Sequence, residues 1–346
     1  RLQGDWSSDV CSSDLLLIFL IFLINFFLKK KNILLNNTGQ IHQSYNQKYQ
    51  VPLSGGLVIL IYIFYNFEFL NLILIFYLTI FFILGLLADL NLIKSPTFRF
   101  LTQILLLIFL LIHLKVQIYD IRINWINDLL QYQYFNIFFV LLCFLVLING
   151  TNFIDGNNGI SLGYYLIIFL LMLTLINDEI IIYNTNFFIS FLIALFILLI
   201  FNLFNKLYIG DSGAYLLSVF SGYILIDIIN QNQNLSPYFI VNIFWYPAFE
   251  ILFSLIRKIK YKYSPLKPDT KHLHQLLFFY YSKKVRLSKS FLNSITGISV
   301  NIFNGLILFF ASMNLNNTKI QLAFILLSLT IYITVYFILF KFKKNQ

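Results

Sequence analysis

The sequence predicts an all-α polytopic integral membrane protein with about eleven transmembrane helices. Of its 346 residues, 59% are hydrophobic and only 11% are charged, whereas a soluble domain carries about 25% charged residues. The apolar residues also gather in runs close to the length that a helix needs to cross a bilayer, roughly 17–25 residues. Polar residues separate these runs, and the longest polar connection spans residues 257–290.

Each apolar run is expected to form one transmembrane helix, in a single transmembrane domain that covers residues 16–346. We expect the first helix to be truncated. The runs are residues 15–28, 52–66, 70–87, 98–115, 136–150, 160–176, 187–203, 212–229, 238–256, 291–312 and 320–340.

The first fifteen residues do not resemble the rest of the chain. The stretch "GDWSSDVCSSDL", residues 4–15, is polar and lacks the layout of a signal peptide. It resembles the in-frame translation of a common sequencing-library adapter. We therefore expect residues 1–15 to be an assembly artefact that replaces the natural N-terminus. Amplification of the native locus tests this expectation, which is wrong if the locus encodes the peptide.

The basic residues predict which side of the membrane each connection occupies. One set of alternate connections holds all but four of the 24 lysines and arginines, the exceptions being Arg1, Lys115, Arg122 and Lys319. The positive-inside rule makes that set cytoplasmic, with the N-terminus outside and the C-terminus inside. This asymmetry accounts for the net charge of +10, and we expect no nucleic-acid binding. The cytoplasmic connections are residues 29–51, 88–99, 151–159, 204–211, 257–290 and 341–346.

The acidic residues on the predicted cytoplasmic side are few, and all but Asp269 lie near the end of an apolar run. Transporters and proton relays need ionisable groups near the middle of the membrane, so these positions disfavour a transporter, which is the main alternative from another class. The acids are Asp89, Asp155, Asp211, Glu250 and Asp269, and three of the four histidines, His42, His272 and His274, fall on the same side.

Carboxylates beside glycines, cations and histidines indicate a site for Mg²⁺ and phosphate. Protein sites for Mg²⁺ use one or two carboxylates together with phosphate oxygens. In "GDSG", Asp211 would begin a helix whose amide groups favour anions. The plainer alternative is that Asp155 and Asp211 are helix N-caps and that the histidines are ordinary interfacial side chains. Their gathering on one face favours the site.

Four ordered segments resemble elements of the polyprenyl-phosphate N-acetylhexosamine-1-phosphate transferases, the WecA/MraY superfamily or glycosyltransferase family 4. "NFIDGNNG" is similar to the family's N-x-x-D-G-x-D-G element, and "YIGDSGAYLLS" to its F-M-G-D-x-G-S-x-x-L-G element. "PDTKHLHQL" is similar to the histidine loop of the WecA branch, and "IHQSYNQKYQVPLSGG" to the loop that precedes the second span. The resemblance covers about residues 36–290.

The resemblance implies phosphoryl transfer on the cytoplasmic face of a bacterial inner membrane. A (N-acetyl)hexosamine-1-phosphate would pass from a UDP-sugar to undecaprenyl phosphate, releasing UMP and beginning a cell-envelope glycan such as the lipopolysaccharide O-antigen. The implied cofactor is Mg²⁺, or Mn²⁺ in its place. The implied partners are the UDP-sugar, the polyprenyl phosphate and the lipid bilayer, with a homodimer as an option.

The resemblance also implies roles for individual residues. Asp211 would be the principal metal ligand, and Asp155 would lie beside the metal and the diphosphate as a second ligand and catalytic group. Asp89 would lie near the lipid phosphate as a base or a positioning group. The expected substrate-binding residues are Arg99, Asn152, Asn158, Asn205, Lys206, Lys271, His272, His274 and His42.

This chain departs from the family pattern at four positions. Ala88 and Asn158 stand where the family has acids, Glu250 stands in place of an aspartate, and Gln275 stands in place of a histidine. The first two remove negative charge near a diphosphate. That loss of charge fits either a subfamily with a different sugar or a weakened enzyme. Because Asp155 and Asp211 are retained, we expect an active subfamily. The alternative is an inactive homologue that only binds lipid.

Overall fold

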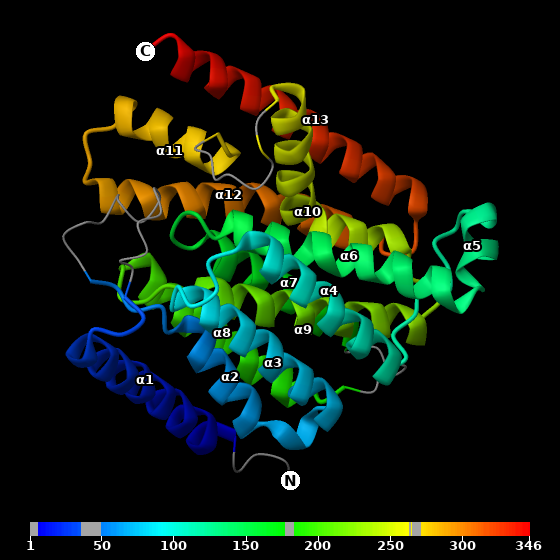
Figure 1. The fold of residues 1–346 in the computed structure, drawn as a ribbon, viewed down its shortest axis with the longest axis horizontal. Coiled ribbons are helices and arrows are strands. Elements are labelled where there is room, and N and C mark those ends of the chain that lie inside the picture. Colours follow the sequence, from blue (N-terminus) through cyan, green and yellow to red (C-terminus); the bar gives the residue numbers. More distant parts are fainter. Residues whose placement is uncertain (1–5, 36–49, 177–182, 263, 265–270) are drawn as a thin grey trace.

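The structure is a computed structural model, and it describes residues 6–35, 50–176, 183–262, 264 and 271–346. The predicted fold class is confirmed: the described chain is a bundle of α-helices without a β-strand (Figure 1). Every predicted apolar run corresponds to one helix. In chain order these are α1 (Trp6–Lys31), α2 (Gly55–Tyr65), α3 (Leu72–Asp89), α4 (Pro96–His113), α6 (Gln133–Ile154), α7 (Ile160–Ile176), α8 (Thr185–Leu203), α9 (Gly210–Gln231), α10 (Pro237–Lys260), α12 (Lys289–Ser312) and α13 (Thr318–Lys344).

Within the described part of the chain, eight helices are long and apolar enough to cross a membrane. They are α3, α4, α6, α8, α9, α10, α12 and α13, while α2 and α7 are apolar but shorter. This pattern makes the chain a multi-pass membrane protein.

Two further helices lie in connections for which the sequence predicted no helix. They are α5 (Asn124–Leu130) and α11 (Leu273–Lys284), and both are too short to cross a bilayer. In Figure 1, α5 lies at one end of the bundle, whereas α11 and the C-terminus lie at the other. A 3₁₀ turn (Phe67–Phe69) joins α2 to α3.

Helix α9 is the centre of the bundle. The apolar window of α9 is 83% buried, whereas those of the peripheral helices α4 and α13 are 22% buried. Helices α2, α3, α6 and α7 all contact α9. Small residues allow this crowding, because helices that lack bulky side chains at a crossing can bring their backbones together.

Two glycines bring neighbouring helices onto the first turn of α9. A Cβ atom on Gly85 of α3 would lie 2.4 Å from Ser212 Cα, and one on Gly56 of α2 would lie 2.5 Å from Gly213 N. Both distances are too short for any side chain. The backbone around Asp211 is therefore positioned by direct contact with two other helices.

Helix α10 contains Pro247, which cannot donate the hydrogen bond that the carbonyl of Ile243 would receive in an unbroken helix. The hydroxyl of Tyr164 in α7 donates to that carbonyl at 2.7 Å and so replaces the missing bond. In Figure 1 the later part of α10 departs from the direction of its earlier part. Helix α10 is therefore bent rather than straight (Figure 1).

Arg122, one of the four basic residues outside the cytoplasmic connections, has a structural explanation. Its Nη2 donates to the carbonyls of Asn234 at 2.9 Å and Leu235 at 3.2 Å. Its Nη1 donates to the carbonyl of Asn316 at 2.9 Å and to Thr318 Oγ1 at 2.6 Å. The guanidinium therefore joins the connection before α10 to the start of α13.

Replacing Arg122 by alanine is expected to lower the melting temperature of the detergent-solubilised protein by a few degrees. The variant loses four hydrogen bonds to one charged group, and we expect a net cost of about 2 kcal/mol. Lys319→Ala, which removes an exposed charge from the same side, is the matched control and should melt like the wild type. Equal melting of Arg122→Ala and the wild type would contradict the bridging role.

Candidate active site

The three predicted cytoplasmic aspartates come from the ends of three helices that meet at one end of the bundle. Asp89 is the last residue of α3, Asp155 is the C-cap of α6, and Asp211 lies in the first turn of α9. The carboxylate of Asp89 binds the first turn of α9. Asp89 Oδ1 accepts a hydrogen bond from Asp211 N at 2.8 Å, and Asp89 Oδ2 accepts one from Ser212 N at 3.1 Å. Asp89 therefore caps α9 from a different helix.

Gly210 makes this cap possible. Its φ angle is +72°, a conformation that favours glycine, and a Cβ atom there would lie 2.6 Å from Asp89 Oδ2. The alternative prediction that Asp155 and Asp211 are helix N-caps is wrong. Asp155 follows a helix, and the capping carboxylate of α9 belongs to Asp89.

Arg99 of α4 pairs with the carboxylate of Asp211. The distance from Arg99 Nη1 to Asp211 Oδ2 is 2.7 Å, and the two side chains are 24% and 17% exposed. The pair is therefore partly open, so a ligand can approach it. The Asn152 side chain of α6 is close enough to the same carboxylate to form a hydrogen bond. Residues from α4, α6 and α9 thus converge on Asp211.

Asp155 is a half-buried carboxylate close to two others. Burial raises the pKa of Asp155 well above its usual range, and the neighbouring charges of Asp211 and Asp89 raise it further. A cation bound beside these acids would favour the ionised form and so lower the pKa. The neighbouring carboxylates therefore create a site that attracts a cation.

The donor set fits Mg²⁺ if the substrate completes the coordination. Among the described residues, no three His, Cys, Asp or Glu side chains gather closely enough to hold a metal by themselves. Mg²⁺, however, is usually bound by one or two carboxylates with phosphate oxygens and water. Asp211 and Asp155 supply such a pair.

The two histidines of the final loop lie against the turn that carries Asp155. The rings of His272 and His274 are stacked, with centroids 5.6 Å apart. The rings of His272 and Phe153 are nearly perpendicular, with centroids 5.1 Å apart, and a Cβ atom on Gly156 would lie 2.5 Å from His274 Nε2. The structure therefore brings α11 to the same end of the bundle as the three aspartates.

Asn158 and Asn205, both predicted to bind substrate, are paired with each other. Asn158 Nδ2 donates to Asn205 Oδ1 at 2.7 Å, and Asn205 Nδ2 donates to Ser290 Oγ at 2.6 Å. Asn158 is buried, with 3% of its surface exposed. These bonds join the connections before α7 and α9 to the start of α12.

Restoring the acid at position 158 is expected to lower the stability of the fold without raising the activity. In Asn158→Asp a buried carboxylate would face Asn205 Oδ1, so the Asn205 amide would have to turn its Nδ2 away from Ser290 to pair with it. We expect a cost of about 1–3 kcal/mol, measured as a lower melting temperature, and no gain in turnover. A variant faster than the wild type would show instead that position 158 takes part in the chemistry.

Two of the remaining predicted binding residues, Lys206 and Lys271, each accept a hydrogen bond through the backbone carbonyl. Lys206 is exposed, and its carbonyl accepts from Asn25 Nδ2 of α1 at 3.2 Å. The carbonyl of Lys271 accepts from Arg257 Nη1 at 2.8 Å. His42 lies outside the described residues.

The structure adds Lys258 to the residues near the site. It is only 3% exposed, and its ammonium lies 5.8 Å from the centre of the Phe153 ring. In the sequence it sits in "IRKIK", among the cations of residues 257–271 that together suit a pyrophosphate. No feature of the sequence distinguishes it from the exposed lysines around it.

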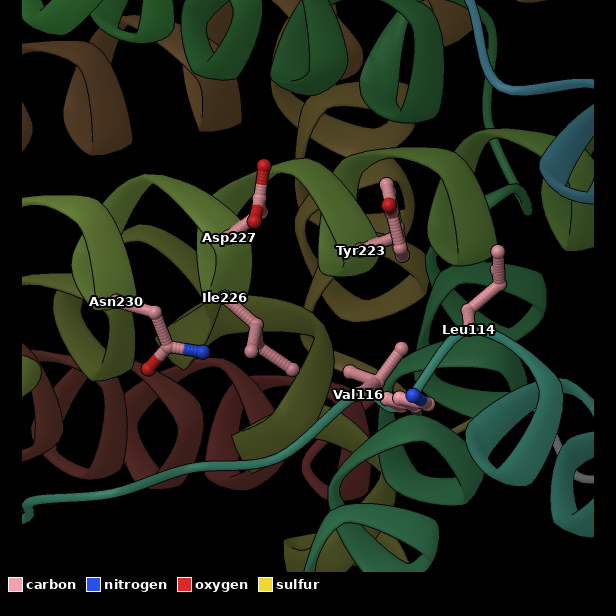
Figure 2. Close-up of a pocket in the computed structure, with 7 residues that line it drawn as sticks. Leu114, Val116, Tyr223, Ile226, Asp227 and Asn230 are labelled. Atoms are coloured by element: carbon pink, nitrogen blue, oxygen red, sulfur yellow. The ribbon is translucent and has the colours of Figure 1, made fainter. Parts of the chain in front are cut away.

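A pocket at the other end of α9 is separate from these residues. It is lined by Lys115, Tyr223, Asp227 and Asn230, together with three apolar residues (Figure 2). Asp227 lies sixteen residues after Asp211 on the same helix, which corresponds to about 24 Å at 1.5 Å per residue. The pocket is thus on the predicted outer side.

The fold and the site together define a multi-pass membrane protein with a cluster of carboxylates, an arginine and histidines at one end of its helices. Residues 70–229 match the sequence profile of the family described as Glycosyl transferase family 4. The match covers α3 through most of α9, including the three aspartates and Arg99, and it confirms the predicted resemblance to this superfamily. It supports a polyprenyl-phosphate sugar-phosphate transferase in general. A search of curated proteins found no match.

Proposed function

We propose that the protein transfers a (N-acetyl)hexosamine-1-phosphate from a UDP-sugar to undecaprenyl phosphate, with release of UMP. The observation that carries this proposal is the convergence of Asp89, Asp155 and Asp211 from three helices, with Arg99 paired to Asp211. The form of the histidine loop, "PDTKHLHQL", favours the WecA-like branch. The product would begin a cell-envelope glycan such as the O-antigen.

In the proposed reaction, an oxygen of the lipid phosphate attacks the β-phosphorus of the UDP-sugar. A new phosphorus–oxygen bond forms to the lipid phosphate, and the bond between the two phosphates of the nucleotide breaks, so UMP leaves with the bonding electrons. Asp155 and Asp211 would hold Mg²⁺, which neutralises charge on the diphosphate. Arg99 would position a phosphate group, because phosphoryl transfer depends on positioning and charge stabilisation.

Asp89 fits a positioning role better than the role of a base. Both of its oxygens accept backbone N–H groups of α9. A phosphate monoester is already largely ionised near pH 7, since its second pKa is about 6. No strong base is therefore required, and Asp89 would act by holding the first turn of α9 in place.

The location of the site suits two substrates of different solubility. The acids lie at helix ends that the basic connections predict to be cytoplasmic. A lipid phosphate would reach this level from the bilayer, and a nucleotide sugar would reach it from the cytoplasm. We place the protein in a bacterial inner membrane, with its N-terminus outside and its C-terminus inside.

A donor panel tests the proposed function. Membranes containing the protein are incubated with Mg²⁺, undecaprenyl phosphate and one UDP-sugar at a time, and UMP is measured. Release that depends on the lipid is expected with at least one UDP-N-acetylhexosamine, and membranes of the same host without the protein are the control. No release with any of these donors would reject the proposal in favour of a transporter or an inactive lipid-binding homologue.

A further inference from the structure

Gln103 of α4 is a buried amide one helical turn beyond Arg99. It is 1% exposed, and its Oε1 accepts a hydrogen bond from Asn149 Nδ2 of α6 at 2.9 Å. The same Nδ2 also donates to the carbonyl of Leu145 at 2.8 Å, so a backbone group of its own helix sets the orientation of the Asn149 amide. The atom of Gln103 that faces Asn149 must therefore be an acceptor, which is Oε1.

This arrangement costs folding free energy. Gln103 Nε2 is buried, and among the described residues it has no hydrogen-bond partner. An unsatisfied buried donor costs more than one hydrogen bond between membrane helices contributes on average. A leucine has nearly the same size as glutamine and no polar atom to satisfy. Stability alone therefore does not account for an amide at this position, and a role in the site does.

The bond between Gln103 and Asn149 lies one turn further into the bundle than the contacts that converge on Asp211. Arg99 lies four residues before Gln103 on α4, and Asn152 lies three residues after Asn149 on α6. Both Arg99 and Asn152 reach the Asp211 carboxylate. Residues three or four apart lie on the same face of a helix, so each of these two partners of Asp211 shares a helix face with one member of the amide pair.

The first turns of α4 depend on this amide for a fixed position. No residue from Pro96 to Thr102 is buried, and Gln103 is the first buried residue of the helix. Arg99 has a long side chain that loses much rotamer freedom when it is held in one geometry. The position of the α4 backbone therefore decides how well Arg99 reaches Asp211, and Gln103 is the nearest buried point of that backbone.

We infer that Gln103 and Asn149 are positioning residues that hold α4 against α6, so that the Arg99 guanidinium stays beside the Asp211 carboxylate. The inference rests on the proposed function and deepens it, because it assigns the amide pair to the preparation of the site that would receive Mg²⁺ and the diphosphate. Both amides act through Arg99, and neither contacts a substrate.

Chemical modification of arginine tests the inference without any substrate. Phenylglyoxal reacts with guanidinium groups, and mass spectrometry of the full-length protein in detergent measures Arg99 separately from Arg286, an exposed arginine that serves as the internal reference. In Gln103→Leu and in Asn149→Leu we expect Arg99 to react about threefold faster relative to Arg286, as follows from the loss of one hydrogen bond between helices. Asp211→Asn, which removes the ion-pair partner, should raise the rate at least as much.

Asn304→Leu is the matched control. Asn304 is a fully buried amide on α12, its Nδ2 donates to the carbonyl of Val300 in its own helix, and its Oδ1 has no partner among the described residues. The substitution removes a buried amide in the same way but leaves α4 and α6 intact. The reaction rate of Arg99 and the release of UMP should both stay within twofold of the wild type.

A double-mutant cycle asks whether the amide pair acts through Arg99. Gln103→Leu alone is expected to lower UMP release about tenfold, as when a group that orients a site residue is lost. In an Arg99→Ala background the same substitution should change UMP release less than twofold, because the guanidinium that it positions is absent. A general structural loss would instead lower the release by the same factor in both backgrounds.

The outcomes separate the inference from the proposed function. If the wild type releases UMP, the inference requires both a faster reaction of Arg99 and a lower UMP release in Gln103→Leu, and either change without the other overturns it while the function stands. Equal factors in the two backgrounds also overturn it. If the wild type releases no UMP with any donor, the proposed function fails. The modification rates then decide alone whether the amide pair positions Arg99, and an unchanged rate rejects that role.

Discussion

Asp211→Asn is expected to lower UMP release by at least about 10³-fold, the loss that follows when a main source of charge stabilisation is removed. The neutral amide is a poor ligand for Mg²⁺ and also loses the ion pair with Arg99, which is 2.7 Å long in the structure. The change keeps the shape of the side chain, so the protein should still insert and keep its melting temperature within a few degrees.

Asp227→Asn is the matched control for this substitution. It makes the same chemical change on the same helix, but at the pocket on the predicted outer side, and it should leave turnover within twofold of the wild type. The measurement is lipid-dependent UMP release at saturating Mg²⁺. Activity of Asp211→Asn close to that of the wild type would refute the assignment of Asp211 as a metal ligand.

Asp89→Asn is expected to lower turnover by about 10²-fold and to raise the Mg²⁺ concentration needed for half-maximal activity. An asparagine has only one oxygen, so one of the two N–H groups at the start of α9 would face an amide nitrogen and lose its partner. The first turn of α9, with Asp211 on it, would then shift.

The Mg²⁺ titration distinguishes the two roles that the sequence left open for Asp89. If Asp89 were a base in the chemical step, its loss would lower turnover at every Mg²⁺ concentration and leave the half-saturating concentration unchanged. A shift in that concentration indicates positioning. Asp128→Asn, at an exposed site on α5, makes the same chemical change far from the site and should alter neither quantity.

The sequence predicted the apolar helices well because their signal is local, although only eight of them in the described chain are long enough to cross a membrane. A run of apolar residues has few alternatives to a helix in a bilayer, where every backbone group must be paired, and all of the expected runs are helical in the structure. Helices α5 and α11 were missed because each is short and lies in a polar connection. His272 and Gln275 form a capping box at the start of α11, but the usual sequence signature has serine or threonine in the first position.

The site was predicted only in part. The sequence shows which residue types lie at the helix ends, but it does not show which distant residues become their partners. Asp89, Asp155 and Asp211 were selected as acids at helix ends, and the structure brings them together. That Asp89 caps α9, 122 residues away along the chain, depends on how α3 packs and cannot be read from the sequence. The same is true of Asn158, whose partner is Asn205, and of Glu250, whose partners His272 and Tyr332 lie 22 and 82 residues away along the chain.

The close contacts of Gly56 and Gly85 with the first turn of α9 have a consequence for mutational scanning. At these positions a selection for folding alone would already reject nearly every side chain, since a single added carbon meets backbone atoms within 2.6 Å. Intolerance to substitution at these glycines reflects the close approach of two backbones and does not indicate a catalytic role. A scan scored by both protein abundance and product formation would separate the two kinds of position: glycines lose abundance first, whereas Asp211 loses product while abundance persists.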